Sequence, residues 1–329
     1  MTQPTGEIIG LLDIDPLVYA CAFAAQKKRF LVSDCDGPVH DFRVQRVGPK
    51  QWHAIEGPKK QEMVLATAYS RAELLKAVEH IEESWTVEEY VDLQPLDHAI
   101  QMGKTAISSC IQNTQCTVFQ GALSVGDCFR CDIATLQEYK GNRKQNEKPA
   151  YYHEMREYFL TQWHVQPVEY YEADDYLATH AWTNPDTTVI ASIDKDLLTI
   201  PGWHYVNKES VAKEDRLFQV TIYQAMQNFM HQLLTGDRVD NIPGLQGVGD
   251  KIAAKILDGK TAIQQWEAVQ EEYKQHFGAE FTYTDWRGEE QTTDWEGVLT
   301  ENGRLLWMVR DPQEPLWNTQ FFREVIGDV

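Results

Sequence analysis

The stretch EIIGLLD, residues 7–13, is an unbroken apolar run that ends in a carboxylate. Such a run is typical of a central parallel β-strand that is covered on both faces, and it places Asp13 at the carboxyl end of that strand. Two similar runs follow, CTVFQGAL at 116–123 and TTVIAS at 187–192. The three runs predict an α/β fold with a mainly parallel central sheet flanked by helices.

Length and charge limit the classes of protein to consider. A chain of 329 residues that is 43% hydrophobic can bury one large core or two smaller ones. Its net charge of −20 normally argues against nucleic-acid binding, which relies on positive charge. The N-terminal region has no basic leader and no apolar run long enough to span a membrane. We expect a monomer in the cytoplasm, a host's cytoplasm if the gene belongs to a phage.

Acidic residues follow these runs or begin the helix predicted in VEYYEADDYLATHA, which lies between the second and third runs. They are Asp13, Asp127, Glu172, Asp174, Asp175, Asp194 and Asp196. Singly, each has a structural explanation, because Asp is common after strands and acids are favoured in a first helical turn. Jointly they predict a cluster, since the carboxyl ends of parallel strands line one crevice. Gathered carboxylates repel one another and therefore require cations.

The ligand types indicate which cations these would be. Oxygen ligands without His or Cys favour Mg²⁺ or Mn²⁺ over zinc. Mg²⁺ keeps several waters, so some of the acids would bind the metal and others would orient its waters. Two such ions suit phosphodiester hydrolysis, in which one activates a water and the other stabilises the leaving oxygen.

The stretch GDRVDNIPGLQGVGDKIAAKIL, residues 236–257, predicts a tight glycine hairpin that leads into a helix. Backbone amides in such a hairpin and at the helix N-terminus can hold a phosphate, although a simple turn is the alternative. Lys251 and Lys255 would share an exposed face of the helix, while Ile252, Ile256 and Leu257 would pack inward. A second basic group, Lys140, Arg143, Lys144 and Lys148, falls within nine residues and suits phosphate, or else forms a solvated helix face.

Five motifs in one order carry a resemblance to a known family: LLDIDPLVY, GDCFR with YKGNRK behind it, YEADDYLA, SIDKDLLTI and the glycine hairpin. They cover about residues 8 to 257, with gaps. The chain resembles the structure-specific 5′ nucleases, which include bacteriophage 5′→3′ exonucleases, the 5′ nuclease domain of bacterial DNA polymerase I and flap endonucleases. The resemblance implies a PIN-like nuclease fold, a helix-three-turn-helix DNA clamp, two Mg²⁺ ions and K⁺ in the glycine hairpin.

The resemblance also implies roles for individual residues. Lys140 and Arg143 match the family's basic pair at the scissile phosphate. The metal-site acids are matched by Asp13, Asp127, Glu172, Asp174, Asp175, Asp194, Asp196 and Asp237, with Asp240 as a supporting member. The DNA-binding residues would be Lys144, Lys148, Gly244, Gly247, Val248, Gly249, Lys251 and Lys255.

The chain departs from the family in two stretches. The loop at 144–149 is short, which argues against threading of a flap beneath a helical arch, as about six residues span at most about 20 Å. Residues 30–97 have no counterpart in the family. They are predicted to contain a strand at 39–47 and a helix that begins with a capping box from Ser70 to Glu73. We favour extra scaffold there over a docking site for a protein partner. The Trp-rich tail, residues 260–329, is predicted to pack as a helical cap.

These observations predict two regions, an α/β nuclease core at 1–205 with the insertion at 30–97, and a helical region at 206–329 with the helix-three-turn-helix at about 222–257. The predicted activity is metal-dependent 5′→3′ hydrolysis at 5′ ends, nicks, gaps or flaps of duplex DNA, with no polymerase fused to it. The alternatives are an RNA-directed 5′ nuclease that removes RNA primers, and a non-catalytic protein that binds DNA structures.

Overall fold

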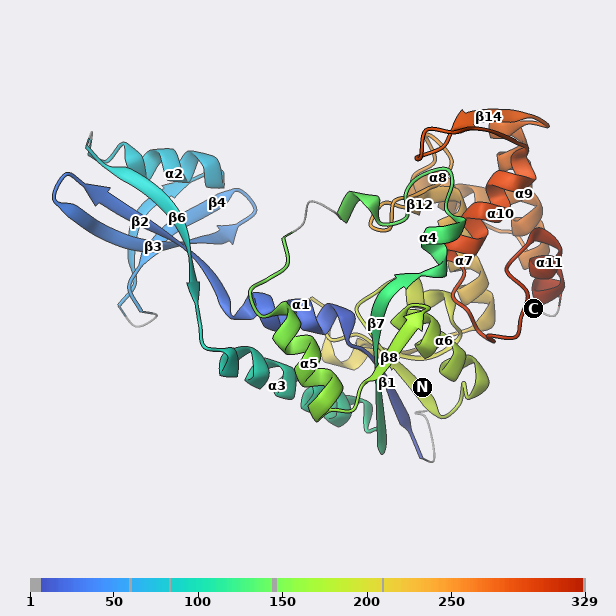
Figure 1. Ribbon diagram of the computed structural model, residues 1–329, viewed down its shortest axis with the longest axis horizontal. Helices are drawn as coiled ribbons and strands as arrows, with labels where there is room; N and C mark the ends of the chain where they lie inside the picture. The colour runs from blue at the N-terminus through green and yellow to red at the C-terminus, as the bar shows by residue number, and fades with distance from the viewer. Residues whose placement is uncertain (1–6, 59–60, 83, 144–146, 209, 328–329) are drawn as a thin grey trace. The chain divides into compact units, whose positions relative to one another are not determined.

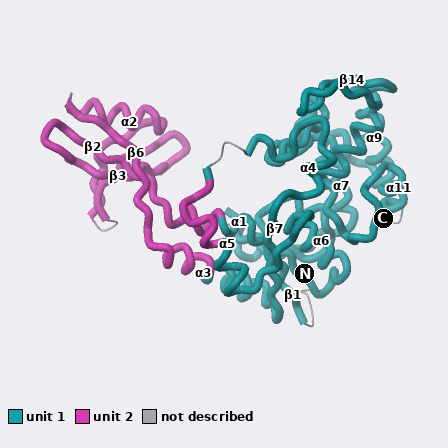
Figure 2. The backbone as a smooth tube through the Cα atoms, viewed as in Figure 1, with its two compact units in different colours: residues 1–18, 104–147, 156–329 teal, residues 19–103, 148–155 magenta. Residues whose placement is uncertain are grey.

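The computed structural model describes residues 7–58, 61–82, 84–143, 147–208 and 210–327. The chain forms two compact units (Figure 2). The first contains residues 1–18, 104–147 and 156–329, and the second contains residues 19–103 and 148–155. None of the described helices is long and apolar enough to cross a bilayer.

The first unit is built on a six-stranded sheet in the order β11-β10-β9-β1-β7-β8. All neighbouring pairs are parallel except β10 and β11, so the predicted mainly parallel sheet is confirmed. Both β1 and β9 are almost wholly buried, as their apolar sequences predict. The strands are β1 (Ile9–Asp13), β7 (Val118–Cys128), β8 (Gln166–Tyr170), β9 (Thr188–Ala191), β10 (Gly202–Tyr205) and β11 (Leu217–Val220).

The edge strand β8 was not predicted from the sequence. Its burial pattern explains this, because only Val168 of its five residues is buried and no apolar run is visible. The helix that follows it, α6 (Ala173–Thr183), was predicted, and it packs on β1, β7, β8 and β9 through side chains such as Leu177. The helix α4 (Phe129–Ile133) also belongs to the first unit, whereas α1 (Asp15–Ala24), α3 (Leu96–Thr114) and α5 (Tyr152–Gln162) each have residues in both units.

The C-terminal part of the first unit is mostly helical and gathers beyond the carboxyl end of β7 (Figure 1). Trp266, Trp307 and Trp317 are buried in its core, as predicted, whereas Trp286 is 40% exposed. The elements are α7 (Ile222–Thr235), β12 (Gly236–Asp237), β13 (Ile242–Pro243), α8 (Asp250–Leu257), α9 (Ala262–Phe277), β14 (Phe281–Thr284), β15 (Glu290–Thr293), α10 (Trp295–Leu306) and α11 (Thr319–Gly327). Short 3₁₀ turns lie at η1 (Gly141–Arg143), η2 (Asp196–Thr199) and η3 (Lys213–Asp215).

The two units do not follow the region boundary predicted between residues 205 and 206. The strand β10, which ends at Tyr205, pairs along its whole length with β11 on the far side of that boundary. The helix α7 also packs on η2, which belongs to the predicted core. The helical region therefore shares one compact unit with the parallel sheet.

The second unit contains the insertion and holds a five-stranded antiparallel sheet in the order β5-β4-β3-β2-β6. Phe30 and Phe42 stack in its core against Leu74 and Val78 of the helix α2. The predicted helix start is confirmed, because Ser70 Oγ accepts a hydrogen bond from Glu73 N at 3.2 Å. The elements are β2 (Gln26–Asp34), β3 (Gly37–Gly48), β4 (Gln51–Glu56), β5 (Met63–Ala68), α2 (Arg71–Glu79) and β6 (Thr86–Leu93).

Candidate metal centre and nucleic-acid interface

The parallel sheet brings the predicted acids to one edge, because β1, β7, β8 and β9 all run in the same direction. Asp13 is the last residue of β1, and Asp127 lies at the end of β7, where it is exposed. Glu172 caps the start of α6 directly after β8. Asp194 and Asp196 follow β9. This edge is where open α/β sheets bind their ligands.

Two acids at this edge, Asp13 and Asp174, have pKa values that are raised by their surroundings. Burial, the charge of Asp15 and the charge of Asp194 raise the pKa of Asp13 to about 8, although Ser192 Oγ donates to its Oδ2 at 3.0 Å. Burial and the charges of Asp13 and Asp194 also raise the pKa of Asp174 well above its usual value. Among the described residues, the buried Asp174 Oδ1 has no hydrogen-bond partner. A buried carboxylate oxygen without a donor is a site that favours a cation.

A second acidic pair connects this edge to the helical region. Asp196 Oδ1 accepts from Gln232 Nε2 of α7 at 2.5 Å, and Asp196 N donates to Asp194 Oδ1 at 2.9 Å. Burial and a hydrogen bond shared with Asp237 raise the pKa of Asp196 to about 8. Burial opposes ionisation of Asp237 too, but that shared hydrogen bond and the amide of Val239 lower its pKa. One proton held between two carboxylates is the usual response to crowded like charges.

The predicted basic pair faces acids of this cluster. Lys140 Nζ contacts Glu172 Oε1 and lies 3.6 Å from Asp240 Oδ2, while Arg143 Nη2 contacts Asp240 Oδ1. Although burial opposes ionisation of Glu172, Arg130 and Lys140 lower its pKa to about 2. Lys140 therefore supplies at Glu172 the positive charge that a metal ion would supply.

The backbone holds Lys140 in an unusual conformation. Its φ is 56°, in the left-handed region that residues with a Cβ rarely adopt, and its amide donates to Asp240 O at 2.8 Å. Backbone outliers of this kind cluster at functional sites, where the surrounding structure compensates for the strain.

Asp175 has a different environment from the one predicted for a metal ligand. It is 2% exposed and forms a bidentate ion pair with Arg130, with distances of 2.7 Å to Nη1 and 2.8 Å to Nη2. Its two oxygens also accept from the amides of Glu172 at 3.0 Å and Val309 at 2.9 Å. Four donors occupy the lone pairs of this carboxylate. Asp175 therefore holds Arg130 and the two backbone amides in place beside the other acids.

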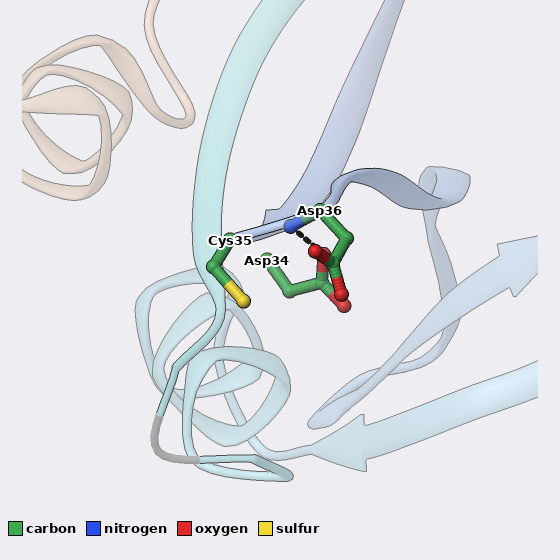
Figure 3. A group of neighbouring side chains, drawn as sticks. All are labelled: Asp34, Cys35 and Asp36. Carbon is green, nitrogen blue, oxygen red and sulfur yellow. Dashed lines mark hydrogen bonds between the residues drawn. The ribbon is translucent and has the colours of Figure 1, made fainter.

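The acids lie near one another without converging on a point. Within the described ranges, the only group of three or more potential ligands whose donor atoms all lie within 4.8 Å is Asp34, Cys35 and Asp36. That group lies in the exposed β2–β3 turn of the second unit, where Asp34 Oδ1 accepts from the amide of Asp36 at 2.8 Å (Figure 3).

The residues at the sheet edge fit hard divalent ions. The donors are oxygens, the buried Asp174 Oδ1 has no partner in the described part of the chain, and burial with like charges raises the pKa of Asp13. Divalent ions there would be held by Asp13, Asp174 and Asp194, with Asp196 and Asp237 beside them.

The predicted glycine hairpin joins α7 to α8. A Cβ on Gly244 would lie 2.2 Å from the backbone of Thr235, so only glycine permits this close approach. Gly247 has a φ of +84° and open space around it, and Gly249, the N-cap of α8, has a φ of −101°. Between them, Val248 is partly buried against the core of the helical region. The amides at the start of α8 are available to an anion.

The inward face of α8 agrees with the prediction at Ile256 and Leu257 but not at Ile252. Ile252 is 49% exposed, and Ala253 and Leu257 form the buried stripe. The helix begins at Asp250, and residues four apart share a face, so an inward Ala253 and Leu257 turn Ile252 outward. Lys251 and Lys255 are exposed, as predicted.

Two of the predicted DNA-binding lysines lie outside the described part of the first unit. Lys144 lies outside the described residues, as does part of the loop predicted to be too short for an arch. Lys148 lies in the second unit, where its Nζ is 4.5 Å from the ring centroid of Tyr152.

The sequence analysis did not assign four residues that contact the acids: Arg130, Tyr139, Ser192 and Gln232. Tyr139 Oη is 2.7 Å from Glu172 Oε2 and 2.8 Å from Asp240 Oδ2. Arg130 and Tyr139 lie in or beside quoted motifs, GDCFR and YKGNRK, so motif position was the signal that could have identified them. Ser192 is likewise the first residue of the quoted motif SIDKDLLTI, whereas Gln232 carries no such signal.

Relatives are found by sequence. The chain is 34% identical over 116 residues to the 5′-3′ exonuclease of Aquifex aeolicus, covering 31% of this chain and 39% of that protein. It is 35% identical over 104 residues to DNA polymerase I of Rhizobium leguminosarum, covering 27% of this chain and 10% of that protein. The matches thus span well under two thirds of these relatives' lengths. No family model matches.

Solved structures with a similar arrangement include the T5 D15 protein co-crystallised with metal ions, with a TM-score of 0.44 and 17% identity over 69% of this chain and 90% of that one. The catalytic core of Rad2 in complex with DNA substrate has a TM-score of 0.38 and 12% identity, over 79% of this chain and 65% of that one. Structural similarity at this level is too weak to support a function. The sequence relatives, in contrast, confirm the resemblance that the motifs predict, because part of the chain is similar to a 5′-3′ exonuclease and to DNA polymerase I.

Proposed function

We propose that this protein is a metal-dependent 5′→3′ exodeoxyribonuclease that removes nucleotides from 5′ ends, nicks or gaps in duplex DNA, and that can also cut flaps. The observation that carries the proposal is the buried acidic edge, where Asp174 Oδ1 has no partner in the described part of the chain and lies near Asp13 and Asp194. Such an edge is costly unless cations neutralise it.

Two divalent ions, Mg²⁺ or Mn²⁺, would supply there the charge that activates water and stabilises a leaving oxygen. The chain's own residues would bind and orient the substrate. Lys140 and Arg143 are paired with Glu172 and Asp240 in this structure. Both side chains are thereby held beside the acidic edge, where they would bind the phosphate to be cut.

The hairpin between α7 and α8 would hold the duplex away from the cut. Its amides and the N-terminus of α8 bind phosphate without reading bases, and Lys251 and Lys255 add charge on the exposed face of α8. A K⁺ ion in the glycine hairpin belongs to the same proposal. Since binding depends on the local field, a net charge of −20 does not prevent it.

Paired end-labelled substrates test the proposal. One duplex labelled at a 5′ end and its twin labelled at the 3′ end of the same strand are digested with Mg²⁺ and with EDTA. We expect early release of short 5′-labelled products, a gradual shortening of the 3′-labelled strand, and no products in EDTA. Metal-independent cleavage, or shortening from the 3′ end, would overturn it, and faster cleavage of a matched RNA strand would favour the RNA-directed alternative.

A further inference from the structure

A pocket of about 240 Å³ lies in the first unit between α4, the end of β8 and the segment after α10. Its volume is below the roughly 300–1,000 Å³ typical of sites for drug-sized ligands, so it suits a smaller group. Five aromatic side chains line it: Phe129, Tyr170, Tyr171, Trp307 and Trp317. Aromatic walls of this kind favour a flat, unsaturated ligand.

Residues that line the pocket are chain neighbours of residues at the acidic edge. Tyr171 directly precedes Glu172, and Phe129 directly precedes Arg130. Arg130 Nη1 lies 3.1 Å from Glu172 Oε2, and Arg130 Nη2 donates to Trp307 O at 2.9 Å. One buried guanidinium thus connects the pocket to an acid beside the proposed metal centre, so a group in the pocket would lie close to the site of cleavage.

Tyr170 is held in a conformation that favours glycine, with a φ of 65°, and its side chain is 56% exposed. Its ring centroid lies 6.2 Å from that of Phe129 and 5.8 Å from that of Tyr171. Core packing does not account for so exposed a ring, and the backbone conformation is a cost that a glycine would avoid. Tyr170 therefore offers an exposed face on which a ligand can stack.

The polar groups around the pocket select which part of a nucleic acid can enter. Asp311 and Glu314 line it, and they would repel phosphate but accept hydrogen bonds from the exocyclic amines and ring N–H groups of bases. Arg304 also lines it and is positioned by donating its Nε–H to Trp317 O at 3.1 Å. Aromatic stacking combined with hydrogen bonds to base edges is how proteins take up unpaired bases.

We propose that this pocket receives an unpaired nucleobase of the strand being cut, stacked on Tyr170. The base belongs to the 5′-terminal nucleotide, next to the phosphodiester that is hydrolysed. This inference rests on the proposed function, and it adds a contact to a base where the hairpin and the basic pair contact only phosphates. An end whose terminal nucleotide is unpaired would therefore bind more tightly than a fully paired end.

A double-mutant cycle between protein and DNA tests the inference. The proteins are wild type, Tyr170→Ala and Tyr170→Phe, and the last keeps the ring as a matched control. The DNAs are a nicked duplex with one unpaired 5′ nucleotide and the same duplex with an abasic residue at that position. Dissociation constants are measured by fluorescence anisotropy with Ca²⁺ in place of Mg²⁺, and intact strands are verified afterwards. Tyr170 is exposed, so its truncation leaves the core unchanged.

We expect Tyr170→Ala to weaken binding of the base-bearing DNA by about tenfold, within the range measured for base–aromatic stacking, and to change binding of the abasic DNA by less than about twofold. Tyr170→Phe should bind both DNAs like the wild type. Equal losses on both DNAs, or no loss on either, would overturn the stacking site while wild-type cleavage leaves the proposed function intact. A wild-type protein that binds neither DNA would overturn the proposed function and this inference with it.

Discussion

The two larger sheets of the molecule differ in how their acidic side chains are paired. In the antiparallel sheet of the second unit, several acids are paired with nearby basic side chains, as in Arg29 with Asp41 at 2.8 Å and Lys28 with Glu89 at 2.7 Å. At the carboxyl edge of the parallel sheet, Asp13, Asp174 and Asp196 crowd together, and their pKa values are raised. The second arrangement is the one where we propose that divalent cations bind.

This difference shows why a total charge is a poor guide to function. A net charge of −20 suggests that the chain avoids nucleic acid, yet what matters is which acids lack a partner. Unsatisfied charge is costly to bury, so it persists only where something else stabilises the bound state. The comparison therefore predicts that the same kind of substitution has opposite effects on stability in the two sheets.

The largest effect is expected from Asp174→Asn. It should lower cleavage by more than about 100-fold, the upper loss typical of changing a residue that only orients a metal ligand, while DNA binding survives. The same change should raise the stability of the metal-free protein, since it removes a repelling charge. Asp194→Asn is a second variant expected to lose cleavage. Initial rates measure cleavage, fluorescence anisotropy measures DNA binding, and urea unfolding in EDTA measures the stability of the metal-free protein. Wild-type turnover in either variant would refute the metal assignment.

Arg130→Met should cause the largest loss of stability, about 3–5 kcal/mol, because it leaves the 2% exposed Asp175 without its bidentate partner. Urea unfolding measures the loss. The double variant Arg130→Met with Asp175→Leu removes both charges and should recover part of it. If the double variant is no more stable than the single one, the ion pair is not the cause of the loss.

The raised pKa values predict how pH acts on the metal-free protein. For Asp13 and Asp196, the pKa is about 8 in the folded state, against 3.8 for an unperturbed aspartate. The folded state then binds more protons, so stability is full below about pH 4 and falls as pH rises toward 8, by up to about 1.4 kcal/mol per pH unit and group.

Mg²⁺ should reverse most of this loss, and should stabilise the protein more at pH 8 than at pH 5, because it competes with the protons on these carboxylates. Urea unfolding at several pH values with EDTA and with Mg²⁺ measures both trends. The prediction fails if stability in EDTA rises between pH 5 and pH 8.

The two hairpin glycines should respond differently to substitution. Gly247→Val forces a β-branched residue to a φ of +84°, at a cost of about 1–2 kcal/mol, and should weaken duplex binding more than single-strand binding. Gly249→Ala is the matched control, since its φ of −101° suits any residue. Fluorescence anisotropy with duplex and with single-stranded DNA measures both affinities. Equal losses of duplex and single-strand binding in a folded Gly247→Val protein would argue against a duplex clamp.

The sequence predicted what local pattern and covalent order determine. Unbroken apolar runs indicated β1, β7 and β9, and the parallel order placed Asp13 and Asp194 at one edge. The features that it did not predict depend on tertiary pairing. β8 lacks an apolar run, and the carboxylate of Asp175 is taken by Arg130, 45 residues away in the chain. Ile252 was assigned the wrong face because helical spacing alone does not tell which face of a short helix is covered.

The smallest effect is expected from Asp41→Asn in the second unit. Asp41 accepts from Arg29 at 2.8 Å and from Tyr90 Oη at 2.8 Å, but its side chain is 40% exposed, so solvent already screens the pair. The amide should cost no more than about 1 kcal/mol in urea unfolding. Cleavage should not change, because the five-stranded sheet is proposed as scaffold and its charges are already matched. Asp174→Asn and Asp41→Asn are the same chemical change, so a gain in metal-free stability for the first and a small loss for the second would express the difference between the two sheets directly. If Asp41→Asn alters the cleavage rate while leaving stability unchanged, the second unit contacts substrate or a partner, and scaffold is the wrong description of it.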